Sequence, residues 1–318
     1  MRAAIRSAST ATSDSWLGVP VGLLAAMLGL LPWLVAGDPL PLQNLWATQT
    51  LPEQMPWAAL PISQYYVPQV LALLVIGAAL AGVAARALRT NEGAITSWQI
   101  WLGVSLVQWA AIVQVFVVLW LGLGIGRQGA GPALIYWLGM LAITALSWLL
   151  GMACFWMISR GSRPAFAIGI AIAAAPLSAW LAAAVVGQQE SWLLPAGLSA
   201  AMPWLAALLV GAALGRCGLG SRQAVLAWLT SAALLLLGPA LLESLGAMFG
   251  SARMMRGDPI AMLVWGARSL GPGALQAVAP TLGGLGFASL ITGVGVLSRR
   301  RDTSAMPVAD NGPMQSNL

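Results

Sequence analysis

The sequence contains no histidine and no lysine, so all 15 of its basic residues are arginine. Histidine is the commonest zinc ligand in proteins and the commonest general base near neutral pH. Its absence excludes the usual zinc sites, histidine-based catalysis and histidine ligation of haem. The two cysteines, Cys154 and Cys217, are too few for a disulfide framework or a four-thiolate metal site. We therefore expect no enzyme activity and no cofactor.

Charged residues are also scarce. They make up 8% of the 318 residues, whereas a soluble domain typically carries about a quarter. Hydrophobic residues reach 59%, and the mean hydropathy is +0.83. So much apolar surface needs lipid around it. The net charge of +6 comes from arginines in short connections and not from a basic face with stacking aromatic residues. It indicates membrane orientation and excludes a nucleic-acid partner.

Long apolar runs, by contrast, are abundant. A helix needs about 20 apolar residues to cross the hydrocarbon core of a bilayer. Eight stretches come near that length and fill most of the chain. The sequence predicts an all-α fold, a polytopic transmembrane helix bundle of about eight spans, with the lipid bilayer as its partner. The expected spans are 16–36, 66–86, 99–124, 132–157, 165–187, 197–215, 224–248 and 281–298.

The arginines give this bundle an orientation. Eleven of them fall on one side of an eight-span arrangement, and arginine-rich connections normally face the cytoplasm. We expect both termini in the cytoplasm (N-in/C-in) and the bundle in a bacterial inner membrane. The bundle would occupy residues 1–301, followed by a disordered cytoplasmic tail over 302–318. The eleven are Arg2, Arg6, Arg86, Arg89, Arg160, Arg163, Arg216, Arg222, Arg299, Arg300 and Arg301.

Two outer segments are longer than simple turns. Residues 37–65 contain five prolines, which predict an extended, ordered loop. In residues 250–280, Asp258-Pro259 is typical of a helix start, and the apolar stretch 260–265 is too short to span. We expect a short interfacial or re-entrant helix there, ended by Gly271-Pro272-Gly273.

Glu243 is the only carboxylate well inside an expected span, and it follows Gly238-Pro239 in the seventh span. Acids within the membrane are costly and often functional, and a proline-broken helix beside an acid is a feature of transporters. The competing interpretation is that Glu243 lies near the outer boundary and reaches the interface. Gln108 and Gln114 in the third span predict interhelical hydrogen bonds. The small residues Ala207, Gly211 and Gly215 predict close helix packing.

The two thiols become candidates once the orientation is applied. Cys154 would lie about one turn from the cytoplasmic boundary of the fourth span, with Ser147 two turns deeper on the same face. Cys217 lies in a glycine-rich cytoplasmic turn beside Arg216, and a neighbouring cation favours the thiolate. The alternative is that each cysteine is a small packing residue.

The segment 145–154 (ALSWLLGMAC) resembles a helix of the KlaC/TelB membrane proteins of the kilA tellurite-resistance operon of IncP plasmids. The resemblance implies a thiol-bearing helix with two sites a heptad apart, of which Cys154 would match one while Ser147 occupies the other. It also implies an oxyanion handled at the cytoplasmic face by thiol sulfur and arginine, and soluble proteins of the same operon as partners.

Two other functions stay open. One is a secondary transporter of a small solute that uses Glu243 and the Gly238-Pro239 break. The other is a non-catalytic scaffold of a secretion or envelope complex, with the two outer segments as docking surfaces.

Overall fold

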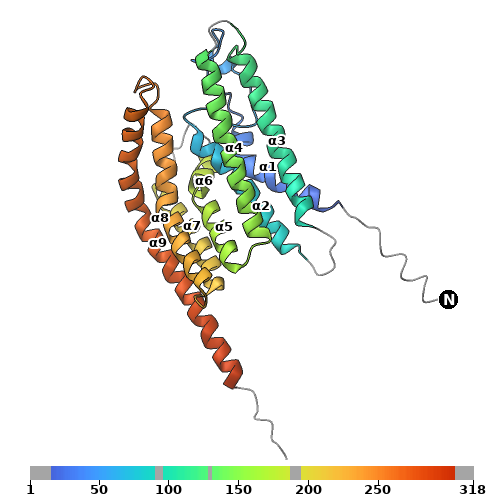
Figure 1. Cartoon of the computed structure of the whole chain (residues 1–318), viewed down its shortest axis with the longest axis vertical. Helices are drawn as coiled ribbons and strands as arrows, with labels where there is room; N and C mark the ends of the chain where they lie inside the picture. Colours follow the sequence, from blue (N-terminus) through green and yellow to red (C-terminus); the bar gives the residue numbers. More distant parts are fainter. Residues whose placement is uncertain (1–15, 90–95, 128–130, 187–194, 305–318) are drawn as a thin grey trace, which may run out of the picture.

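The computed structural model describes residues 16–89, 96–127, 131–186 and 195–304. These ranges form a bundle of α-helices with one 3-10 turn, η1, and no strand is assigned within them (Figure 1). The elements are α1 (Gly18–Ala36), η1 (Pro52–Gln54), α2 (Val67–Ala87), α3 (Ser97–Gly122), α4 (Gly131–Ser159), α5 (Arg163–Ala174), α6 (Leu177–Val186), α7 (Ala196–Cys217), α8 (Arg222–Gly250) and α9 (Pro259–Ser304).

Seven of the described helices are long and apolar enough to cross a membrane. The short helices α5 and α6 pass the same test as a pair and bring the number to eight if they count as one span. The protein is therefore an all-α, multi-pass membrane bundle, as the sequence predicted. The side of the membrane on which the termini lie stays a prediction. Arg2 and Arg6 lie outside the described residues.

The expected span over 165–187 is not a single straight helix. It breaks between α5 and α6, and the two parts differ in direction by 44°. The break falls at Ala175-Pro176. Proline at this point has no amide hydrogen for the carbonyl four residues earlier, and its ring clashes with that carbonyl. The apolar pattern alone did not predict this bend because it continues across the break.

The expected short helix ended by Gly271-Pro272-Gly273 is wrong. Asp258 does cap a helix start, since its Oδ1 accepts hydrogen bonds from the amides of Ile260 (2.9 Å) and Ala261 (3.3 Å). The helix then continues through Pro272 and Pro280 to Ser304. A break within the bilayer would leave backbone groups without water, so the helical ladder continues past proline. The expected tail thus begins helically at 302–304, and 305–318 lie outside the described residues.

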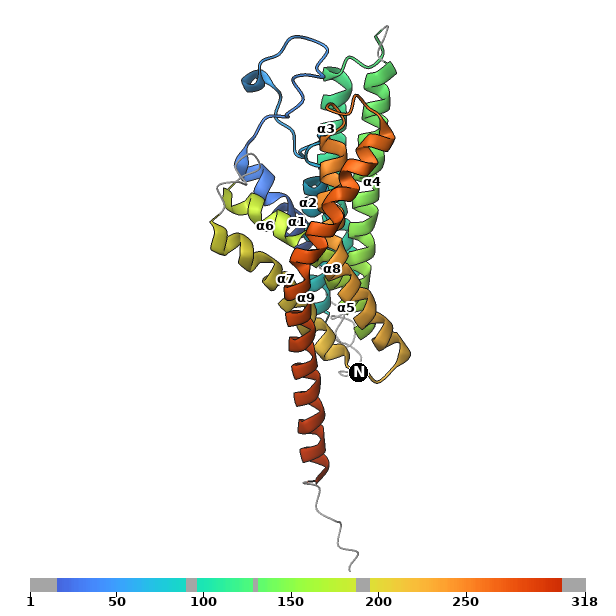
Figure 2. The ribbon, with the colours of Figure 1, turned by 90° about the vertical axis from the view of Figure 1, so that its left-hand side faces the viewer.

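The outer segment 37–65 is ordered and mostly extended, as expected. Trp33 Nε1 donates to the carbonyl of Ala58 at 2.7 Å, and Pro39 forms an isolated bridge with Trp57. Gln114 of α3 accepts from the amide of Ala59 at 2.9 Å. The segment therefore forms a cap over one end of the bundle, which Figure 2 shows beside the connected ends of α3 and α4.

The bundle has two halves, which we call the N-terminal half (α1–α4) and the C-terminal half (α5–α9). Figure 1 shows α8 and α9 side by side as a layer separate from α3 and α4. In the N-terminal half, Gln108 Nε2 donates to the carbonyl of Leu74 at 2.8 Å, which confirms the interhelical bond expected for Gln108. Gln114 instead bonds the outer segment. A Trp180 Nε1 bond to the carbonyl of Gly29 (2.7 Å) joins the halves.

The arginine-bearing end is built by specific contacts. Arg86 at the end of α2 donates to the carbonyls of Ile158 (2.9 Å) and Gly161 (3.0 Å) and lies over the Phe166 ring, 4.6 Å from its centroid. These bonds satisfy carbonyls that the end of α4 leaves free. Arg86 therefore holds the α4–α5 turn against α2 and serves the fold as well as the charge asymmetry.

Candidate functional site

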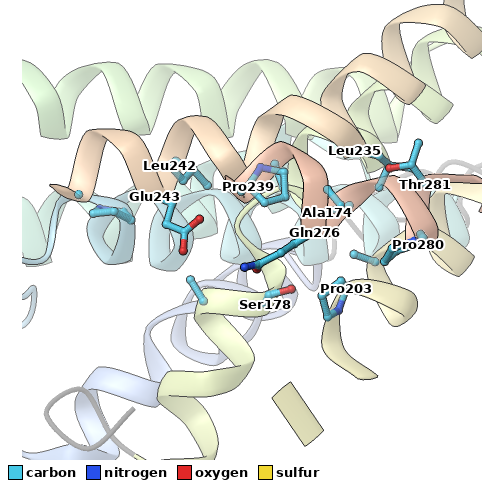
Figure 3. Close-up of a pocket in the computed structure, with 18 residues that line it drawn as sticks. Ala174, Ser178, Pro203, Leu235, Pro239, Leu242, Glu243, Gln276, Pro280 and Thr281 are labelled. Atoms are coloured by element: carbon cyan, nitrogen blue, oxygen red, sulfur yellow. The ribbon is translucent and has the colours of Figure 1, made fainter. Parts of the chain in front are cut away.

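A cavity of about 430 Å³ lies inside the C-terminal half (Figure 3). It extends from Pro239, near the middle of α8, to Pro68 in the first turn of α2 and therefore reaches from mid-span toward one end of the bundle. Five helices of the C-terminal half and the first turn of α2 form its wall. The lining residues are Pro68, Ala174, Ala175, Ser178, Ala179, Pro203, Ala206, Ala207, Leu235, Pro239, Leu242, Glu243, Gly246, Gly273, Gln276, Ala277, Pro280 and Thr281.

Proline interrupts the hydrogen-bond ladder of three helices around this cavity and separates two others. Pro203 of α7, Pro239 of α8 and Pro280 of α9 lie inside their helices and line the cavity. The α5–α6 break at Pro176 leaves Ala175 in the wall as well. Proline cannot donate to the carbonyl one turn earlier. Pro239 therefore deprives the Leu235 carbonyl of its helical partner, and Pro280 does the same to Gln276.

Glu243 is the one carboxylate within the described membrane spans, and it lies one turn beyond Pro239. Its side chain passes between α8 and α9 over Gly273, where an added Cβ would come within 2.7 Å of Glu243 Oε2. Figure 3 shows the carboxylate and the amide of Gln276 on the same side of the cavity. Glu243 thus lines a cavity between helices and is itself an exposed residue at its edge, so the functional and the interfacial interpretations both stay open.

A second, outer cavity of about 320 Å³ meets the central one at Glu243. Glu243, Gly273 and Gln276 line both cavities, whereas Arg268 and Ser269 line only the outer one. The two spaces share a boundary made of one carboxylate, one amide and a residue without a side chain.

Sequence reasoning missed the other polar groups of the cavity. Ser178 on α6 is half-buried opposite Gln276, and Thr281 on α9 is buried. Neither residue forms a motif with Glu243, because the three come from different helices or distant turns. A usable signal was the series of prolines at similar depth in consecutive spans, of which we used only Pro239.

The structure places Ser147 and Cys154 in packed surroundings away from this cavity. Ser147 is 3% exposed, and its hydroxyl donates to the carbonyl of Ile143 at 2.9 Å. Cys154 is fully buried, and its thiol contacts the carbonyl of Gly169 in α5 at 3.1 Å. Both lie on the buried face of α4, so an oxyanion in water does not reach them in this conformation.

Cys217 and Arg216 lie at the end of α7. Cys217 is a half-buried free thiol and Arg216 is exposed. The following Gly218 has a positive φ of 71°, and its carbonyl accepts from Trp228 Nε1 at 3.0 Å. The two cysteines belong to different parts of the bundle, since Cys154 packs with α2 and α5 whereas Cys217 ends a helix that packs on α9.

The small residues of α7 pack as expected. An added Cβ at Gly211 would lie 2.5 Å from the Gly284 carbonyl, and one at Gly215 would meet Ile291 at 2.6 Å. This stripe therefore serves close contact between α7 and α9. Among the described residues, no group of three His, Cys, Asp or Glu side chains is placed to hold a metal ion.

Comparison with known proteins identifies no relative. No protein-family model matches the chain, and neither a curated protein nor a solved structure resembles it significantly.

Proposed function

We propose that the protein is a secondary transporter of a bacterial inner membrane and that a small solute crosses through the central cavity. One observation carries this proposal. Glu243, the one carboxylate within the described spans, lines a cavity that reaches mid-span, and proline interrupts the helices around this cavity. Transporters commonly bind their substrate near the bilayer midplane, between broken helices whose unpaired backbone groups serve as ligands.

The shared boundary at Glu243 supports a gated path. A solute in the central cavity contacts the same carboxylate that faces the outer cavity. Gly273 lets this carboxylate lie directly on α9, so a small shift of α8 along α9 moves it from one cavity toward the other. Alternating access needs such a movable group near a fixed site.

Tellurite handling through Cys154 and Cys217, with operon proteins as partners, is a separate hypothesis that rests on the resemblance of 145–154. The burial of Cys154 gives it no support in this conformation. The scaffold hypothesis would use the outer segment 37–65, which is packed as a cap. We prefer the transporter because it explains the cavity, the prolines and Glu243 together.

The test uses cysteine accessibility and needs no known substrate. Ser178→Cys is introduced in a Cys154→Ser/Cys217→Ser background, so that a single thiol lines the cavity. A membrane-impermeant methanethiosulfonate reagent is applied to spheroplasts and, separately, to inside-out vesicles. A transporter that alternates its access exposes Ser178→Cys to both sides, so we expect labelling in both preparations.

Ser231→Cys is the matched control. Ser231 is fully buried on α8, and its hydroxyl has no hydrogen-bond partner, so a thiol replaces it at little cost. It should stay unlabelled in both preparations. If Ser178→Cys also stays unlabelled from both sides in properly inserted protein, the central cavity is not a transport site.

A further inference from the structure

We infer that the central cavity takes a small organic cation, a primary ammonium group on a short apolar body. This inference rests on the proposed function and names its substrate class. The cavity combines one carboxylate, at Glu243, with hydrogen-bond acceptors and apolar walls. No basic residue is among the side chains that line it.

Acceptors for an ammonium group come from three helices. Glu243 supplies the charge from α8, Gln276 an amide oxygen from α9, and Ser178 a hydroxyl from α6. Pro239 and Pro280 have no amide hydrogen to donate to the carbonyls of Leu235 and Gln276, two residues that also line the cavity. An ammonium group has three donors and no acceptor, so it matches this set.

The rest of the wall fits an apolar body. Proline, alanine and glycine form most of it, including Pro203, Ala206 and Ala277. A sugar would leave most of its hydroxyls unpaired against such a wall, and burying unpaired hydroxyls is costly. An anion would face Glu243 without a compensating cation, because Arg268 lines only the outer cavity.

Arg268 gives this assignment a consequence for gating. It shares the outer cavity with Glu243, on the far side of Gly273 from the central space. The carboxylate therefore has a cationic neighbour toward the outside when the central cavity is empty. A cationic solute in the centre replaces Arg268 as the nearest positive charge, so solute binding and the position of Glu243 are linked.

The first experiment measures the charge preference of the cavity in the full-length protein. The single thiol of Ser178→Cys is reacted with a trimethylammonium-bearing and a sulfonate-bearing methanethiosulfonate, and both rates are normalised to 2-mercaptoethanol. We expect the cationic reagent to be favoured by about tenfold or more, as for unit charges roughly 10 Å apart at an effective dielectric constant of about 20. Glu243→Gln should remove this preference and leave both reagents reactive.

The second experiment measures protection by soluble probes. Millimolar n-butylammonium should slow the labelling of Ser178→Cys severalfold, whereas n-butanol and n-butyrate, with the same carbon chain, should not. Equal protection by all three probes, or a charge preference that survives Glu243→Gln, overturns the cation assignment while the cavity stays a transport candidate. If Ser178→Cys reacts with neither reagent from either side, the proposed function itself is wrong.

Discussion

The two halves of the bundle are both mainly apolar, but they are packed differently. In the N-terminal half, large side chains such as Trp33 and Phe116 fill the space below the outer segment, and glycine and alanine bring α1, α2 and α3 into direct contact. In the C-terminal half, alanine, glycine and proline form most of the wall of a cavity. Small residues therefore close the helix contacts of the N-terminal half but leave a space open where the surrounding helices are interrupted by proline.

Proline placement follows a similar division with one exception. α3 contains no proline, and the single Pro68 of α2 lies in the first turn, where its missing amide costs nothing. The exception is Pro32, which lies inside α1 near its C-terminal end. The C-terminal half has proline inside α7, α8 and α9 and at the α5–α6 break. Because interior prolines are more numerous in the C-terminal half, we expect its helices to bend more readily than those of the N-terminal half, which we call the frame.

Close helix contacts in the frame should be sensitive to small substitutions. In Gly29→Ala the new methyl group meets the backbone of Gly77, because α1 and α2 are in direct contact there. Relief requires the two helices to separate, at a cost of about 1–3 kcal/mol. We expect a clearly lower melting temperature in detergent, followed by intrinsic tryptophan fluorescence.

Gly139→Ala is the control for that comparison. Gly139 is an exposed position in α4 with open space around it, so alanine there should be neutral or stabilise the helix by up to about 1 kcal/mol. Equal melting temperatures for the two variants would mean that α1 and α2 do not pack as closely as described.

A substitution at the boundary of the cavities should act on the site more than on stability. In Gly273→Ala the methyl group comes within 2.7 Å of Glu243 Oε2 and 3.1 Å of the Ala240 Cα. The flexible carboxylate moves aside, so the charge preference at Ser178→Cys should fall severalfold while the melting temperature drops less than in Gly29→Ala. Gly271→Ala, two residues away in open space, should leave that preference unchanged.

The positions of the helices could be predicted from sequence better than the cavity. Spans such as 66–86 and 224–248 lie within two residues of α2 and α8, because each is set by a local apolar run between polar ends. The sequence analysis expected a straight helix through Pro176 and a helix end at Gly271-Pro272-Gly273, and both expectations were wrong. The same residue type bends a helix at the first and is accommodated within α9 at the second, according to the packing around it.

The cavity could not be predicted from the sequence because its lining residues come from separate helices. Ser178 and Gln276 are ordinary polar residues in the sequence and become significant only because α6 and α9 line the same cavity as Glu243. Ser147 and Cys154 show the opposite case, in which the sequence pattern was clear but the site was not formed. The heptad spacing of Ser147 and Cys154 does place both on one face of α4, but that face packs in the core.

The smallest effect that we expect concerns Ser147 and Cys154. The hypothesis of tellurite handling predicts that Ser147→Cys raises tellurite tolerance modestly and that Cys154→Ser cancels the gain. Tolerance is read on plates at expression levels matched by immunoblot, with Ser231→Cys as a buried control outside α4. Equal tolerance in all strains would remove the thiol mechanism and leave the cavity proposal untouched.

The most direct test of the account compares one thiol from each half. Ser105→Cys lies in the frame, 7% exposed on α3, and Ser178→Cys lines the cavity. Each is labelled in the cysteine-free background with an impermeant reagent, first from the periplasmic and then from the cytoplasmic side. We predict that Ser178→Cys reacts from both sides and Ser105→Cys from neither. Equal reactivity of the two thiols would contradict the division into a closed frame and a transporting half.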